Sequence, residues 1–170
     1  TEFGGDILPI EVTYFEGKGE LVITGNLGNV MKESATIALD YVKSKASKYN
    51  IDPKFFESHG IHIHVPEGAV PKDGPSAGIA LTTAVISCLT NAKVKSTVAM
   101  TGEVNLRGQA LAIGGLKEKS LAALRSGIKT IVIPRDNQKD ISDLPHEVKS
   151  KLEIVLMDQV DDALEVAFEK

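Results

Sequence analysis

Residues 61–89 read IHIHV PEGAVPKDGP SAGIALTTAVISCL, and this stretch decides the class of fold. Its first five residues alternate apolar Ile and Val with His, which is typical of a β-strand with one buried face. Pro66 to Pro75 is polar and rich in Gly and Pro, so we expect a loop there. From about Ser76 to about Leu89 the residues are apolar nearly all round, which predicts a buried helix. A strand followed by a loop and a buried helix indicates a domain that mixes sheets and helices.

Before this stretch, the pattern predicts two strands and a long helix. Ile10, Val12 and Tyr14 alternate on one face of a first strand, and residues 21–23 return as a second strand after a Gly-Lys-Gly turn. We therefore expect an N-terminal β-hairpin. Apolar residues at helical spacing then predict a helix over residues 31–49.

After this stretch, short apolar runs alternate with amphipathic segments. Strands are expected at residues 98–100, 109–113, 131–133 and 152–157, and helices over 115–127 and 160–168, with short helical turns in the charged stretch 136–151. The order predicts an α+β fold with α/β-like alternation, a mixed sheet and packed helices. Because no composition shift marks a boundary, residues 1–170 are expected to form one domain.

Composition and charge exclude several classes of protein. The chain has 170 residues, of which 42% are hydrophobic and 25% charged, with a net charge of −4 and no Trp. Such a chain is neither disordered nor a dedicated nucleic-acid binder. No apolar run approaches a membrane span, and the N-terminus lacks the pattern of a signal peptide. The single cysteine, Cys88, favours a reducing, cytoplasmic compartment. Because residue 1 is Thr1 and not Met, we expect the chain to have been cut from a longer one.

Ser76 has two interpretations at the start of its expected helix. A serine there commonly caps the helix by accepting a backbone N–H bond. Alternatively it is a nucleophile, because a helix start gathers unpaired N–H groups that stabilise an oxyanion. Gly74 to Gly78 also match the G-x-S-x-G nucleophile elbow. That match is weak, because no buried strand directly precedes Ser76 and only His146 follows it as a candidate histidine base.

A nucleophilic serine needs a base, and lysine is an established alternative to histidine. Lys117 and Lys119 lie in the first turn of an expected helix, where the helix dipole opposes cations and lowers a lysine pKa. Alternatively, the two lysines have no catalytic role and only keep the charged helix end in contact with water. Helix geometry does not choose between these interpretations or between the two lysines. His62 and His64 share a strand face, but without a third ligand they do not predict a metal site.

Three ordered motifs resemble the proteolytic domain of the Lon protease family, of the bacterial A type. They are Pro71-Lys72-Asp73-Gly74-Pro75-Ser76-Ala77-Gly78, Thr101-Gly102-Glu103 with Leu106-Arg107-Gly108, and Ile113-Gly114-Gly115-Leu116-Lys117-Glu118-Lys119. The resemblance covers essentially the whole chain and implies the family's fold, which is similar to domain 2 of a small-subunit ribosomal protein.

The resemblance also implies the roles of individual residues. Ser76 corresponds to the nucleophile and Lys119, rather than Lys117, to the general base, with the hydroxyl of Thr101 against the lysine amine. It places four residues near the active site, its loop or a subunit contact, namely His62, Asp73, Glu103 and Arg107. The backbone N–H groups of Ser76 and Ala77 are the candidates for the oxyanion hole.

The implied function is ATP-dependent hydrolysis of unfolded, damaged or short-lived regulatory proteins through an acyl-enzyme, in a homo-hexamer. No G-x-x-x-x-G-K-[ST] motif occurs in this sequence. ATP and Mg are therefore expected to bind upstream ATPase and substrate-binding domains absent from this chain, and no cofactor, metal, membrane or nucleic acid is expected to bind this domain. Two alternatives are a Lon-like scaffold that has lost catalysis and an esterase-like hydrolase that uses Ser76 with a histidine.

Overall fold

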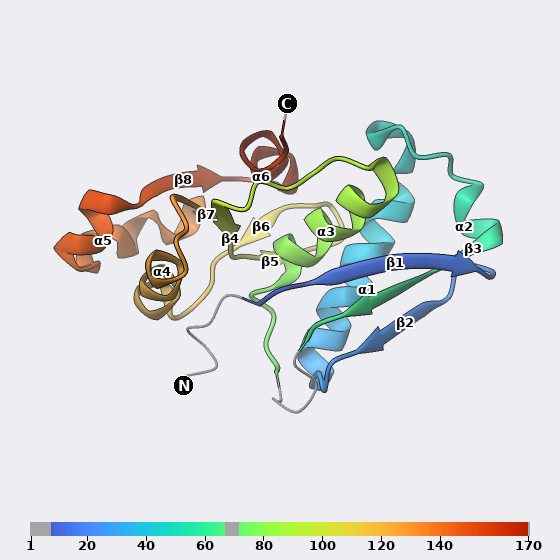
Figure 1. Ribbon diagram of the computed structural model, residues 1–170, viewed down its shortest axis with the longest axis horizontal. Helices are drawn as coiled ribbons and strands as arrows, with labels where there is room; N and C mark the ends of the chain where they lie inside the picture. The colour runs from blue at the N-terminus through green and yellow to red at the C-terminus, as the bar shows by residue number, and fades with distance from the viewer. Residues whose placement is uncertain (1–7, 67–71, 170) are drawn as a thin grey trace.

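The computed structural model describes residues 8–66 and 72–169, and Figure 1 shows two sheet regions on either side of a central helix. The strands are β1 (Glu11–Glu16), β2 (Leu21–Thr24), β3 (His59–His64), β4 (Val98–Met100), β5 (Glu103–Val104), β6 (Ala110–Leu111), β7 (Thr130–Pro134) and β8 (Glu153–Met157). The α-helices are α1 (Asn29–Ser44), α2 (Phe55–Ser58), α3 (Gly78–Thr90), α4 (Leu116–Arg125), α5 (His146–Lys151) and α6 (Val160–Ala167). Two 3-10 helices, η2 (Ala46–Tyr49) and η3 (Arg135–Asp143), complete the elements. The α+β class and the mixed sheet are thus confirmed.

The expected N-terminal β-hairpin is wrong, because β1 and β2 are not neighbours. The sheet order is β1-β3-β2, with β3 antiparallel to β1 and parallel to β2. The Gly-Lys-Gly turn passes around the start of β3, where Gly17 N donates to Ser58 O (3.0 Å) and Gly19 N donates to His59 O (2.9 Å). A turn between two alternating segments predicts a hairpin locally, but here a later strand enters between them and satisfies the backbone of both.

Helices α1 and α3 cover the inner face of this sheet and supply most of the main core. The buried face of α1 carries Met31, Ala35, Ala38 and Val42, at the spacing that predicted a helix. The α-helix ends at Ser44 rather than near Tyr49, and a 3-10 turn completes the expected length. Helix α3 is apolar nearly all round because it packs against α1, α6, β1 and β5 at once.

A second, parallel sheet has the order β4-β7-β8, and β5 and β6 form a separate two-stranded ribbon. Helices α4 and α5 pack on the second sheet over a smaller core, which includes Leu116, Ala123, Ile131 and Val148. The single expected sheet is therefore three sheets, because α3 separates the two regions (Figure 1).

In the part of the chain that the structure describes, no helix combines the length and the apolar character needed to cross a bilayer. The arrangement brings the start of α3, the end of β4 and the first turn of α4 together between the two sheet regions (Figure 1).

Candidate active site

The segment before α3 is anchored to the start of α1. Lys72 pairs with the β2–α1 connection, since Gly28 N donates to Lys72 O (2.7 Å) and Lys72 N donates to Asn26 O (3.1 Å). The Asp73 carboxylate accepts the backbone N–H of Met31 (2.9 Å) and so caps α1 from another part of the chain. The backbone N–H groups of Met31, Gly74 and Val30 hold the pKa of Asp73 below its usual value.

Ser76 is held in place by hydrogen bonds to its backbone carbonyl rather than to its side chain. Its carbonyl oxygen accepts Gly102 N (2.8 Å) and the Thr101 hydroxyl (3.4 Å), and Ile79 N donates back to Gly102 O (3.0 Å). The N-cap of α3 is Ala77, so the capping interpretation of Ser76 is wrong. Within residues 8–66 and 72–169, the Ser76 hydroxyl makes no hydrogen bond, and neither do the backbone N–H groups of Ser76 and Ala77.

Glycine at position 78 lets the start of α3 approach β5 closely. A Cβ there would lie 2.7 Å from the backbone nitrogen of Val104 and 2.9 Å from its Cγ1. Real side chains do not come so close to backbone, so any larger residue would push α3 away. The glycine therefore sets the position of the residues just before it, including Ser76.

Lys119 lies in the first turn of α4, where its ammonium group is partly buried. Its Nζ donates to Gly114 O (2.7 Å), and burial lowers the lysine pKa against a smaller, opposite effect of the Glu118 carboxylate. Lys117 is exposed on the same turn. The structure thus distinguishes the two lysines, between which helix geometry did not choose, and it is Lys119 that lines the cavity beside the start of α3.

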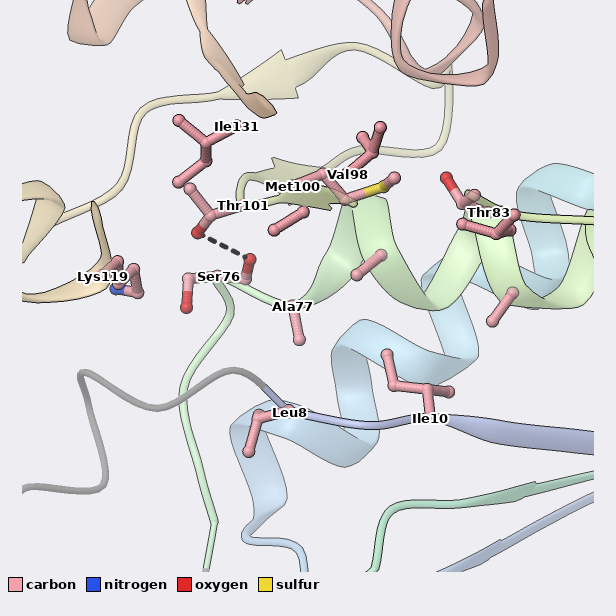
Figure 2. Close-up of a pocket in the computed structure, with 14 residues that line it drawn as sticks. Leu8, Ile10, Ser76, Ala77, Thr83, Val98, Met100, Thr101, Lys119 and Ile131 are labelled. Atoms are coloured by element: carbon pink, nitrogen blue, oxygen red, sulfur yellow. Dashed lines mark hydrogen bonds between the residues drawn. The ribbon is translucent and has the colours of Figure 1, made fainter. Parts of the chain in front are cut away.

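Ser76 and Lys119 line the same cavity, which has a volume of about 250 Å³. Figure 2 shows both side chains at the end of the cavity where Thr101 also lies, whereas Thr83 marks the other end. The remaining walls are mostly apolar and come from the segment before β1, from α3, from β4 and from β7. Among the described residues, no hydrogen bond joins Ser76 to Lys119, because the lysine donates to Gly114 instead.

The other expected site residues divide into two groups. Thr101 lines the cavity, but its hydroxyl donates to the Ser76 carbonyl, and no hydrogen bond within the described chain joins it to Lys119. Four residues do not line the cavity, namely His62, Asp73, Glu103 and Arg107. His62 shares the hydroxyl of Thr24 with His64 on the open face of the first sheet (2.9 and 2.6 Å).

Glu103 and Arg107 belong to the β5–β6 ribbon. Glu103 begins β5, directly after the Gly102 that anchors Ser76. Arg107 is exposed at the ribbon's turn, where its guanidinium donates to Gln109 Oε1 (3.4 Å). Both residues are therefore connected to the Ser76 backbone through the ribbon and do not touch the cavity.

The apolar walls of the cavity escaped the sequence analysis. They include Leu8, Ile10, Ala80, Ala84, Val98 and Met100. Ala80 and Ala84 lie one helical turn apart, and two small residues on one face of an otherwise bulky helix are a signal of a hollow. Across residues 8–66 and 72–169, no three His, Cys, Asp or Glu side chains gather in a way that could hold a metal ion.

Comparisons with known proteins identify the family of this chain. The family described as "Lon protease (S16) C-terminal proteolytic domain" matches residues 1–170. The chain is 58% identical over 170 residues to a Lon protease of Chloroflexus aggregans and 55% identical over 167 residues to Lon protease 1 of Myxococcus xanthus. It is also 58% identical over 168 residues to a Lon protease of Mycoplasma mycoides.

These matches cover 100%, 98% and 99% of the chain but only 21%, 20% and 21% of the three relatives, so the chain spans about a fifth of the length of the curated relatives it matches. A serine hydroxyl without a hydrogen bond in the described part of the chain shares one cavity with a partly buried lysine, and one family model covers every residue around them. The chain therefore belongs to the family of Lon protease C-terminal proteolytic domains.

Proposed function

We propose that this domain hydrolyses peptide bonds with Ser76 as nucleophile and Lys119 as general base. The observation that carries the proposal is their shared cavity, in which the serine hydroxyl is unengaged and burial lowers the lysine pKa. A lysine can accept a proton only when it is neutral, and a lowered pKa increases the neutral fraction near physiological pH.

In the proposed reaction, Ser76 Oγ attacks the scissile carbonyl while Lys119 Nζ takes the hydroxyl proton. A neutral amine has two N–H groups and one lone pair. It can therefore keep its bond to Gly114 O while its lone pair turns toward Ser76. The Gly114 carbonyl then acts as a positioning group for the base.

We assign stabilisation of the oxyanion to the backbone N–H groups of Ser76 and Ala77, which make no hydrogen bond within residues 8–66 and 72–169. Lys119 returns the proton to the leaving amine and next activates a water that hydrolyses the acyl-enzyme. Every step uses groups of this chain, so the proposal assigns no cofactor or metal to this domain.

We further propose that the domain acts on unfolded, damaged or short-lived regulatory proteins as part of a longer, ATP-dependent chain, with ATP and Mg bound in other domains. The full-length relatives, about five times as long, support this view. A homo-hexamer and a cytoplasmic location are the corresponding proposals for the whole protein. Extended substrates would be recognised mainly through backbone pairing.

A serine–histidine mechanism has less support. None of the described residues that line the cavity is a histidine, and His146 begins α5, which packs on the second sheet beside α4. A scaffold without catalysis would not need both an unengaged serine and a partly buried lysine in one cavity.

The test is hydrolysis of a fluorogenic peptide by the wild type, Ser76→Ala and Lys119→Ala, with Lys117→Ala and His146→Ala as controls. We expect Ser76→Ala and Lys119→Ala to lose at least about 100-fold in kcat/KM, the usual size of a general-base contribution, and both controls to retain activity. Because the reaction needs neutral lysine, the rate should rise with pH along a limb centred below lysine's ordinary value of about 10.4. Activity that survives in Lys119→Ala would overturn the mechanism.

A further inference from the structure

Thr83 is a buried threonine whose hydroxyl has no hydrogen-bond partner among residues 8–66 and 72–169. Its side chain lines the cavity, the residue is 2% exposed, and its Oγ1 makes no hydrogen bond with the described part of the chain. The other threonines of α3 behave differently, since Thr82 donates to Gly78 O (2.8 Å) and Thr90 donates to Ile86 O (2.7 Å). Buried polar groups are nearly always paired, so an orphan at the wall of a cavity points to a ligand that pairs with it.

The position of Thr83 fixes how far such a ligand must reach. Figure 2 shows Thr83 at the end of the cavity away from Ser76, with its oxygen on the side toward Val98. Thr83 lies five residues after Gly78 on α3, or roughly 7.5 Å along the helix axis at ~1.5 Å per residue. The small side chains of Ala80 and Ala84, which also line the cavity, leave open the space between Ser76 and Thr83. A side chain held beside Ser76 must therefore be long to approach Thr83.

The chemistry of the cavity walls restricts which functional group can stand at the end of that side chain. Because the cavity is mostly apolar away from Lys119, a charged tip would lose its hydration without a partner. An amide tip carries two donors and a carbonyl, more than one hydroxyl can satisfy. A phenol carries a single O–H group, and a threonine hydroxyl can donate to it or accept from it.

We propose that Thr83 is a specificity-determining residue that hydrogen-bonds the phenol of a tyrosine placed immediately before the cleaved bond. The inference rests on the proposed function, because it takes Ser76 as the point of attack. It deepens that function by predicting a preference for tyrosine over phenylalanine, two side chains that differ by one oxygen.

The test uses two peptides that are identical except for Tyr or Phe before the cleaved bond, with the cleavage position verified by mass spectrometry. For the wild type we expect kcat/KM to favour the Tyr peptide by about 3- to 10-fold, the range of one net hydrogen bond. Thr83→Val keeps the shape and removes the hydroxyl, so the ratio should fall to about 1 or below. Thr82→Val, an equally buried neighbour that does not line the cavity, should leave the ratio unchanged.

A binding measurement separates this inference from the proposed function. In Ser76→Ala, which carries out no chemistry under the proposal, p-cresol and toluene are titrated and followed by NMR shifts of cavity residues. We expect p-cresol to bind more tightly by a similar factor, and Thr83→Val on that background to abolish the difference.

Equal rates for both peptides in the wild type and Thr83→Val, with Ser76→Ala inactive, would overturn the role of Thr83 and leave the proposed function standing. If Ser76→Ala cleaves like the wild type, the proposed function fails. The titration then decides alone whether Thr83 recognises a phenol, and equal binding of the two probes overturns that recognition.

Discussion

The two sides of the cavity are built differently. On the serine side, the Ser76 carbonyl accepts two hydrogen bonds, Asp73 caps α1, and Gly78 packs directly on the backbone of β5. On the lysine side, the Lys119 ammonium makes one hydrogen bond within residues 8–66 and 72–169, to Gly114 O, and a Cβ at Gly114 would meet no atom within 4 Å. The backbone of Ser76 is thus part of the core's framework. The start of α4 is also packed, since Leu116 is buried and Asn137 binds Ile113, but the Lys119 side chain itself is attached at a glycine that touches little else.

From this difference we expect substitutions on the two sides of the cavity to affect stability and activity differently. Changes on the serine side should cost stability as well as activity, because the same contacts hold the fold and position Ser76. Changes on the lysine side should cost activity with little effect on stability. Three substitutions test this contrast, in order of the expected loss of stability.

Gly78→Ala should have the largest effect. The added methyl group would lie 2.7 Å from the backbone nitrogen of Val104, which cannot move without shifting β5. We expect a loss of about 1–3 kcal/mol in the free energy of unfolding, measured in urea, as is typical of overpacking. Peptidase activity should fall as well, because α3 carries Ser76 with it.

Gly114→Ala is the matched control on the lysine side. A Cβ there meets no atom within 4 Å, so the free energy of unfolding should change by less than about 0.5 kcal/mol. If the two variants lose equal stability, the contrast between the two sides is wrong.

Asp73→Ala should have an intermediate effect, since it removes a carboxylate that accepts backbone N–H groups at the start of α1. We expect a lower midpoint of thermal unfolding at pH 7, with Asp40→Ala as a control that removes an equal charge from the exposed side of the same helix. Because the pKa of Asp73 is lowered in the folded state, its contribution is present above the unfolded value of about 3.9. It should disappear as the pH falls through the folded value. A difference between wild type and Asp73→Ala that persists unchanged at low pH would show that the carboxylate charge is not what stabilises the helix.

Local sequence pattern predicted the helices and strands well but predicted poorly which strands pair with one another. The alternation of residues 61–65 and the apolar run after Ser76 correspond to β3 and α3, since period and burial are encoded residue by residue. The hairpin failed because the choice of strand partner depends on β3, nearly forty residues later. No local rule distinguishes a turn that closes a hairpin from one that leaves a gap for another strand.

The candidate site likewise has features that the sequence predicted and features that only the fold reveals. Ser76 and Lys119 came from motif resemblance, and their shared cavity requires the fold to bring residues 43 positions apart together. The backbone hydrogen bond from Gly102 to Ser76 and the unpaired state of the Thr83 hydroxyl in the described chain could not be predicted from the sequence. Both depend on elements that meet only in the folded domain.

Lys119→Met should have the smallest effect on stability. Burial disfavours the ammonium form and lowers the lysine pKa, so removing the charge at pH 7 should leave the free energy of unfolding unchanged within about 0.5 kcal/mol or raise it. Between the folded pKa and the unfolded value of about 10.4, the unfolded chain binds the extra proton. Wild-type stability relative to Lys119→Met should therefore rise as the pH increases through that window. Urea titrations at several pH values measure this directly. A loss of stability in Lys119→Met as large as that in Gly78→Ala would show that Lys119 is anchored as firmly as Ser76, and the contrast between the two sides of the cavity would fail.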